Sequence, residues 1–225
     1  MVVNEIFNSI DGEGKRAGEL TTFIRFCGCN LKCDYCDTKY SWQNNGIDMT
    51  VEQIVDKLKQ TGFHNVTITG GEPLIQSRID KLVCSLLDNG FYVNIETNGT
   101  LDPSKVLSTS FSNPNLFITM DYKTKCSGYE QEMKFENFEC LTNRDVLKFV
   151  VADKQELLSA VHFMYLLESY STHKDSLPIV YFSPVFGKIE PKEIVEFMKE
   201  QNLQKNCRVQ LQLHKYIWNP NKRGV

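Results

Sequence analysis

The sequence predicts an α/β fold, an open or partial (incomplete) βα barrel with a reduced number of helices. Helical patterns separate several short strand-like runs, and this alternation favours a parallel sheet with right-handed crossovers. Six or seven strands exceed the helices, so a complete eightfold barrel is not expected. The strand-like runs, rich in β-branched and aromatic residues, are 22–26, 66–69, 92–97, 116–121, 146–151, 179–183 and 208–214.

Four helices are expected from local start and stop signals. Thr50 and Gln53 have the spacing of a capping box, and Gly62 suits the end of the helix that follows. The other three helices are expected at 78–89, 154–170 and 191–202. Pro191 suits the first turn of the last of these.

The composition is that of an ordinary globular protein, with 225 residues, 41% hydrophobic and 24% charged. We expect a single domain over residues 1–225. No apolar run is long enough for a membrane helix, and the N-terminus lacks the pattern of a secretion signal, so we expect a cytoplasmic protein. The net charge is −3 with scattered Lys and Arg, which favours a small-molecule substrate over nucleic acid.

Polar motifs follow five of the predicted strands. Because parallel strands gather chemistry at their carboxyl ends, these motifs are expected on one rim. They are 29–36, 70–73, 96–99, 121–123 and His214, which we expect to end the last strand.

Three of the eight cysteines, Cys29, Cys33 and Cys36, lie within eight residues. A reducing compartment disfavours disulfides. A zinc site would need a fourth ligand, and no His is near. A thioredoxin-like pair at Cys33 and Cys36 would leave Cys29 unexplained. Three thiolates on a four-iron cluster would leave one iron open to a reactant.

The spacing Cys29-x-x-x-Cys33-x-x-Cys36 resembles the signature of the radical S-adenosylmethionine (SAM) superfamily, and 70–73, Gly-Gly-Glu-Pro, resembles its second motif. The resemblance implies a 4Fe–4S cluster held by the three cysteines, SAM on the open iron, and a barrel of the radical SAM type. Cys84, Cys140 and Cys207 are then expected to be ordinary thiols, while the roles of Cys27 and Cys126 stay open.

Further segments resemble the 7-carboxy-7-deazaguanine synthase family, namely 9–14, 23–31, 36–38, 212–215 and 223–225. This implies a lyase that converts 6-carboxy-tetrahydropterin to 7-carboxy-7-deazaguanine with loss of ammonia, in queuosine and deazapurine biosynthesis. It also implies Mg²⁺, a homodimer, and an electron donor such as flavodoxin or ferredoxin, with no nucleic acid or membrane partner.

The resemblance assigns roles to individual residues. Arg25, Glu96 and His214 are expected to be catalytic, with Arg25 binding the substrate carboxylate through paired charge-assisted bonds. Thr38 matches the Mg²⁺ ligand. The other substrate contacts are Ile10, Asp11, Gly12, Glu13, Thr69 and Val225. The SAM contacts are Tyr35, Cys36, Asp37, Gly70, Gly71, Glu72, Asp121 and Lys123.

Two departures and several alternatives accompany this interpretation. The family more often has Gln where Asp11 stands, and Ser-Pro-Lys where this chain has 121–123, Asp-Tyr-Lys. Thr38 also suits a helix cap. Other functions consistent with the cysteine pattern are a glycyl-radical-enzyme activase, a non-catalytic iron–sulfur redox protein and a structural zinc module.

Overall fold

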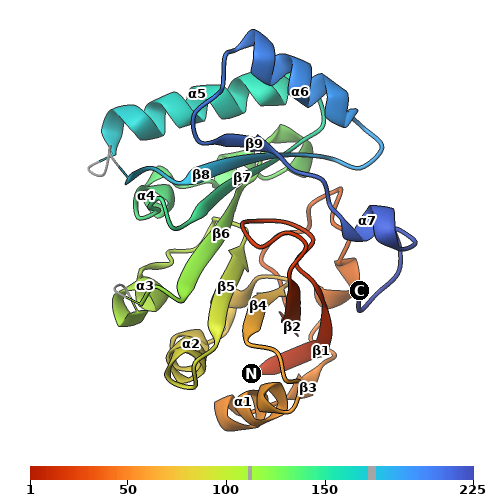
Figure 1. Cartoon of the computed structure of the whole chain (residues 1–225), viewed down its shortest axis with the longest axis vertical. Helices are drawn as coiled ribbons and strands as arrows, with labels where there is room; N and C mark the ends of the chain where they lie inside the picture. Colours follow the sequence, from red (N-terminus) through yellow and green to blue (C-terminus); the bar gives the residue numbers. More distant parts are fainter. Residues whose placement is uncertain (111–112, 172–175) are drawn as a thin grey trace.

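The computed structural model describes residues 1–110, 113–171 and 176–225. Within these residues nine strands form one curved sheet (Figure 1). The strands are β1 Val2–Ile10, β2 Leu20–Phe26, β3 Ile47–Asp48, β4 Asn65–Gly70, β5 Tyr92–Thr97, β6 Leu116–Tyr122, β7 Val146–Val151, β8 Ile179–Pro184 and β9 Cys207–Val209.

The strand order is β3-β1-β2-β4-β5-β6-β7-β8-β9. From β2 and β4 through β9 every neighbouring pair is parallel, whereas β1 is antiparallel to both β2 and β3. β3 and β9 are the outer strands, so the sheet curves as a partial barrel and does not close. This confirms the predicted fold class.

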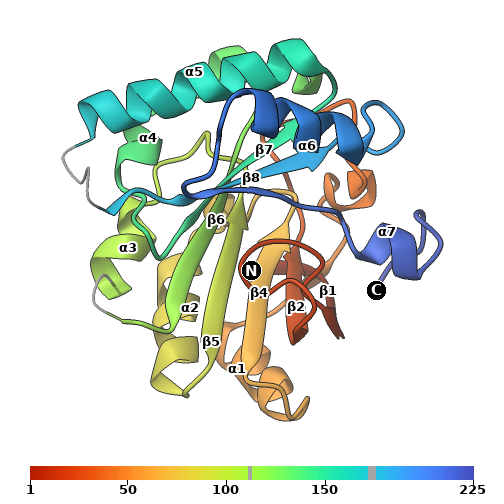
Figure 2. The same cartoon turned by 45° about the horizontal axis from the view of Figure 1, so that its top comes forward.

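Helices cover the outer face of the sheet. In Figures 1 and 2, α1–α3 lie beside β4–β6, and α5 and α6 lie over β7–β9, while α7 lies apart from them near β1 and β2. The helices are α1 Val51–Lys59, α2 Ile79–Asp88, α3 Ser104–Ser110, α4 Phe135–Glu139, α5 Lys154–Tyr170, α6 Pro191–Glu200 and α7 His214–Ile217. Short 3₁₀ turns are η1 Lys39–Ser41, η2 Pro73–Ile75, η3 Lys125–Ser127 and η4 Glu130–Glu132.

The alternation of side chains along the strands separates the core from the site. Ile24, Ile68 and Ile95 pair across adjacent strands in one row, and each is fully buried. The next residue on each strand points to the opposite face. That second row begins with Arg25 and Thr69, which line a cavity on the inner side of the barrel.

Most elements match their predicted ranges, including β5, β7 and α5, and the Thr50–Gln53 capping box forms both of its hydrogen bonds. The sequence patterns did not predict β1, β3, α3, α4 and α7.

The prediction of a strand over 208–214 was wrong beyond Val209. Only three residues of β9 pair with β8. The Leu213 N–H then donates to the Gly12 carbonyl at 3.1 Å. This bond turns the chain toward the β1–β2 loop, so His214 begins α7 and does not end a strand.

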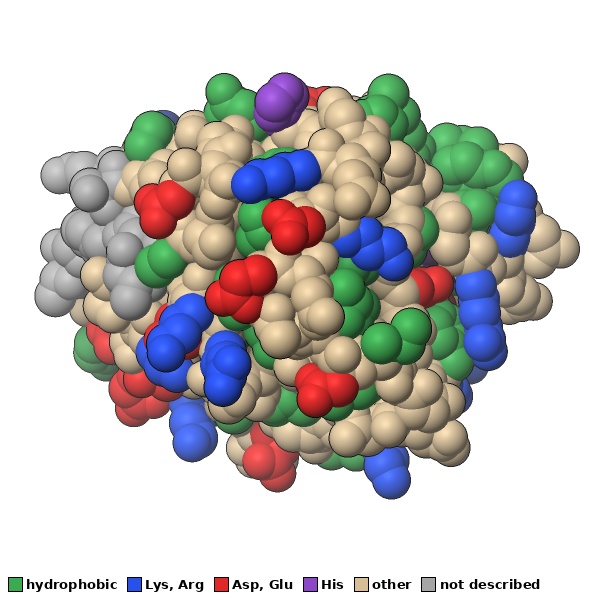
Figure 3. Space-filling view, turned by 90° about the horizontal axis from the view of Figure 1, so that it is seen from below, with side chains coloured by type: hydrophobic (Ala, Val, Ile, Leu, Met, Phe, Trp, Pro, Cys, Tyr) green, Lys and Arg blue, Asp and Glu red, His purple; other side chains and the backbone are tan. Residues whose placement is uncertain are grey.

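No helix of the described residues is long and apolar enough to cross a bilayer. On the face shown in Figure 3, basic and acidic side chains are interspersed.

Gly70→Ala should destabilise the fold far more than Gly62→Ala. A Cβ at Gly70 would lie 2.5 Å from the Phe26 carbonyl oxygen, and its φ is +154°. Gly62 also has a positive φ but has open space around it, so its substitution should cost only about 1 kcal/mol. Thermal unfolding of the two variants measures the difference, and equal midpoints would contradict the packing argument.

Candidate active site

A cavity of about 730 Å³ opens at the carboxyl ends of the parallel strands. Its wall combines the ends of β2 and β4–β8 with the loop after β1, the cysteine loop and the C-terminal segment. All the site residues predicted from the sequence line it except Asp11 and Glu72.

The cysteine loop runs from Cys29 to Cys36, between β2 and η1. All three thiols line the cavity. The Leu31 N–H donates to the Cys29 sulfur at 3.4 Å. Burial raises the pKa of the Cys29 thiol and raises that of Cys33 to about 11, with the Lys123 ammonium opposing both shifts.

The thiols do not converge on a point. In the described parts of the chain, no three His, Cys, Asp or Glu side chains are placed to hold a single metal ion. The thiols instead lie around a shared space, each within electrostatic reach of another. A multi-iron cluster, which spreads its cysteine ligands over several metal atoms, suits this arrangement.

The Gly70–Pro73 loop follows β4 and packs on the cysteine loop. The Gly71 N–H donates to the Phe26 carbonyl at 3.1 Å and the Glu72 N–H to the Gly28 carbonyl at 2.8 Å. A Cβ on Gly71 would overlap the Gly28 carbonyl. Only glycine therefore lets the two loops touch through their backbones.

Glu72 is fully buried and is not among the residues that line the cavity. Its carboxyl group accepts from Leu74 N–H at 2.9 Å, Thr97 hydroxyl at 2.8 Å and Asn98 N–H at 2.7 Å. Burial raises the pKa of Glu72 to about 7 against these donors. Glu72 thus fixes its loop to the end of β5.

Asp11 is also turned away from the cavity. Its carboxylate accepts from Arg16 Nε at 2.8 Å and the Thr67 hydroxyl at 2.6 Å. Its N–H and carbonyl bond to Glu19 and Gly18. Asp11 therefore anchors the loop after β1, and it is not among the residues that line the cavity.

Glu13 lies in the same loop and does face the cavity. Its carboxylate accepts from the Ser183 hydroxyl at 3.1 Å, and from Lys148 Nζ and Gln212 Nε2 at 3.4 Å each. Ile10 and Gly12 complete this side of the wall, and α7 packs on Gly12 so closely that a Cβ there would lie 2.9 Å from His214 Nδ1.

Arg25 is held by a carboxylate and aromatic rings. Its Nε donates to Glu5 Oε1 at 2.8 Å, and the Tyr40 hydroxyl donates to the same oxygen at 2.7 Å. A bulge between Val3 and Glu5 re-registers β1 so that Glu5 lies opposite Arg25. Because Glu5 bonds Nε, the two terminal nitrogens of the guanidinium have no hydrogen-bond partner in the described residues, and they suit a planar anion.

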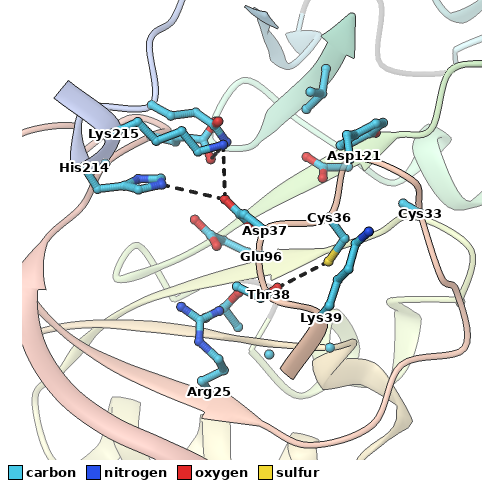
Figure 4. A pocket seen from close by; sticks show the side chains of 18 of the residues that line it. Arg25, Cys33, Cys36, Asp37, Thr38, Lys39, Glu96, Asp121, His214 and Lys215 are labelled. Carbon is cyan, nitrogen blue, oxygen red and sulfur yellow. Dashed lines mark hydrogen bonds and ion pairs between the residues drawn. The ribbon is translucent and has the colours of Figure 1, made fainter. Parts of the chain in front are cut away.

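Asp37 is central to the pocket mouth (Figure 4). Its carboxylate lies 3.5 Å from Lys215 Nζ and 3.7 Å from His214 Nε2. Withdrawal from water opposes ionisation, but these groups hold the pKa of Asp37 below its usual range. These two contacts link α7 to Asp37, the residue that directly follows the cysteine loop.

Thr38 is the N-cap residue of η1, but its side chain makes no capping hydrogen bond. The cap position predicted for Thr38 is confirmed, and its hydroxyl is not used for capping. The hydroxyl lies 3.5 Å from the Cys36 sulfur and lines the cavity.

Glu96, Asp121 and Lys123 form the deep wall, on β5 and at the end of β6. Burial raises the pKa of Glu96 to about 7, while Lys148 opposes the shift. Lys123 Nζ donates to Asp121 Oδ2 at 2.6 Å. One carboxylate oxygen of Asp121 is therefore paired with Lys123. The other, Oδ1, lies 3.0 Å from Lys148 Nζ.

Sequence reasoning missed several residues of this site. Lys148 could have been found, because a lysine inside the apolar run 146–151 requires buried partners. Glu5 and Tyr40 carry no such signal in the sequence. Glu5 lies opposite Arg25 only because of a β-bulge, and Tyr40 reaches Glu5 only because of the position of its loop. The other lining residues not foreseen are Phe7, Asn98, Lys188, Gln212, Lys215 and Arg223.

Residues 23–109 match the radical SAM superfamily. The chain is similar to the 7-carboxy-7-deazaguanine synthases of Clostridium acetobutylicum, at 46% identity over 99% of this chain and 98% of the relative, and of Chlorobaculum tepidum, at 37% over 99% and 96%. The crystal structure of QueE from Escherichia coli shares the fold, with a TM-score of 0.68, 24% identity, and coverage of 93% and 92%.

The open barrel, its cysteine loop and the superfamily match define a radical SAM enzyme. Within that class, whole-length similarity shows that the chain belongs to the 7-carboxy-7-deazaguanine synthase family.

Membership implies a 4Fe–4S cluster and SAM, and the residues present fit both. The three thiols supply the cluster's ligand type. The Tyr35 hydroxyl is buried at the cavity wall without a hydrogen-bond partner among the described residues, as expected where a bound molecule supplies one. The cavity is of the size usual for small-molecule sites.

Cys33→Ala should abolish cluster loading, because it removes one of three thiolate ligands. Iron content and the visible absorption of anaerobically reconstituted protein measure this. Cys207→Ala, on β9 and outside the cavity, is the control and should retain full iron. Equal iron in both variants would contradict the ligand assignment.

Proposed function

We propose that this enzyme converts 6-carboxy-tetrahydropterin to 7-carboxy-7-deazaguanine with loss of ammonia, as its relatives' name states for their product. The observation that carries the proposal is the single cavity that joins three cluster thiols to a guanidinium with free terminal nitrogens. The product is the substrate less one ammonia, so the net reaction needs no external oxidant.

We assign the substrate carboxylate to Arg25, oriented by Glu5, and the donor-rich edge of the pterin to Glu13 and the Gly12 N–H. Thr69 and Glu96 line the same side. The stacked rings of Phe7 and Phe23, whose centroids are 5.0 Å apart, give that side an apolar surface. Val225 and His214 also line the cavity and are assigned to the substrate.

For SAM we assign the opposite side of the cavity. Tyr35, Asp37, Gly70, Gly71 and Lys123 form this wall next to the cysteine loop. Asp121 places a carboxylate where a ribose hydroxyl can donate. When bound, cluster and SAM supply the radical that removes a hydrogen atom from the substrate. The chain's own residues hold the two reactants together and exclude water.

Thr38 is proposed as the protein ligand of Mg²⁺, because its hydroxyl is free of capping and lies beside the cluster loop. Oxygen ligands from one side chain, substrate and water suit that ion. We also propose that residues 1–225 act as one domain, that the enzyme is a homodimer, and that a flavodoxin or ferredoxin reduces it.

Anaerobic turnover tests the function. Reconstituted, reduced enzyme is given SAM, Mg²⁺ and 6-carboxy-tetrahydropterin, and mass spectrometry should find the deazaguanine carboxylic acid. Cleavage of SAM without this product would keep the radical chemistry and refute the substrate. A glycyl radical on a co-expressed partner would favour the activase alternative. If enzyme with an intact cluster does not cleave SAM, the non-catalytic redox protein is favoured.

Arg25→Lys should raise the KM for the pterin at least tenfold, since losing one bond of a charge-assisted pair costs about 1.5 kcal/mol or more. SAM cleavage without substrate should change little. Arg208→Lys, on β9 and outside the cavity, is the matched control. An unchanged KM in Arg25→Lys would remove Arg25 from the carboxylate site.

A further inference from the structure

We propose that Lys148 is a positioning residue of this active site: its buried ammonium holds Glu13 as an oriented carboxylate that accepts the donor edge of the pterin. The inference rests on the proposed function and assigns a role to a residue outside the predicted site.

Lys148 is set rigidly in the fold. It lies in the middle of β7, between β6 and β8, and only 8% of its side chain is exposed. Its Nζ lies 3.0 Å from Asp121 Oδ1 and 3.4 Å from Glu13 Oε2, and it lines the cavity. A charged lysine at such a site needs buried carboxylate partners, and both are present.

Glu13 depends on this lysine for its orientation. Its other partners are the Ser183 hydroxyl and the Gln212 amide, which are neutral. Lys148 is therefore the cation that contacts Glu13 in the described structure. The side chain of Glu13 is only 12% exposed, so water contributes little to holding its carboxylate in place.

Lys148 is surrounded mainly by carboxyl groups. Facing it are Glu13 from the β1–β2 loop, Glu96 from β5 and Asp121 from β6. Lys123 is the second cation and is paired with Asp121 at 2.6 Å. Asp11 acts on Glu96 but is itself paired with Arg16, and Thr69 hydrogen-bonds Glu96.

Removal of Lys148 leaves Glu13 with two neutral partners, the Ser183 hydroxyl and the Gln212 amide. The ammonium that bridges Glu13 to Asp121 is then lost. A carboxylate that turns away no longer offers the paired acceptor oxygens that a pterin's ring N–H and amino group require.

The consequence for binding follows from this geometry. Lys148→Met should weaken pterin binding about tenfold, because a misplaced acceptor loses hydrogen bonds to the ligand. In a Glu13→Gln background the same change should have little effect, because the carboxylate that Lys148 holds is already absent.

The experiment is calorimetric titration of cluster-loaded, unreduced enzyme and SAM with 6-carboxy-tetrahydropterin. Lys148→Met should bind about tenfold more weakly than the wild type. Lys148→Arg, which keeps the charge, should bind within about twofold of the wild type. Glu13→Gln should bind more weakly than the wild type, and adding Lys148→Met to it should change the affinity by less than about twofold.

Equal weakening by Lys148→Met in the wild-type and Glu13→Gln backgrounds would mean a structural role only and would overturn the proposal. So would a Lys148→Arg variant that binds as weakly as Lys148→Met. If Lys148→Met does not fold, Lys148→Arg and Glu13→Gln carry the test, and the proposal is overturned if either one departs from its expected affinity. A wild type that binds no pterin refutes the proposed function as well.

Discussion

The backbone contact between the ends of β2 and β4 underlies the whole site. Phe26 and Gly70 pair in register, and the N–H groups of Gly71 and Glu72 continue the contact onto the cysteine loop. This fixes the cluster thiols relative to the parallel strands whose ends supply the other ligating groups. A side chain at either glycine would separate the two loops, so the cysteine spacing is useful only with the glycines beside it.

The inner face of the sheet carries polar and charged side chains, whereas its outer face carries apolar ones. The isoleucine row of β2, β4 and β5 packs under the helices, while the residues one step along carry the guanidinium, hydroxyl and carboxyl groups of the site. Buried charges of this kind are costly alone and stable in pairs. Arg25 with Glu5, and Lys148 with Asp121 and Glu13, are such pairs, and each keeps a free face toward the cavity.

Most of the fold could be predicted because it depends on local patterns. β-branched runs mark the strands, and the Thr50 capping box marks α1. The errors lie where tertiary contacts decide. β9 is short because α7 is drawn to the Gly12 carbonyl. The sequence also could not show the internal partners of Asp11 and Glu72, which stand in site motifs, lie outside the cavity lining and each accept several hydrogen bonds. Glu5 reaches Arg25 through a bulge that no sequence pattern signals.

The cavity wall takes residues from both ends of the described chain, from Phe7–Glu13 and from Gln212–Val225. The residues 219–223 are exposed and contribute no side chain to the hydrophobic core. Activity and folding are consequently separable at this end of the molecule. Proteolytic cleavage near Asn219 would leave the stability of the sheet unchanged but would impair the cavity. A bulky fusion partner attached after Val225 would have the same effect. Solubility and cluster content would not reveal such damage, whereas substrate affinity would.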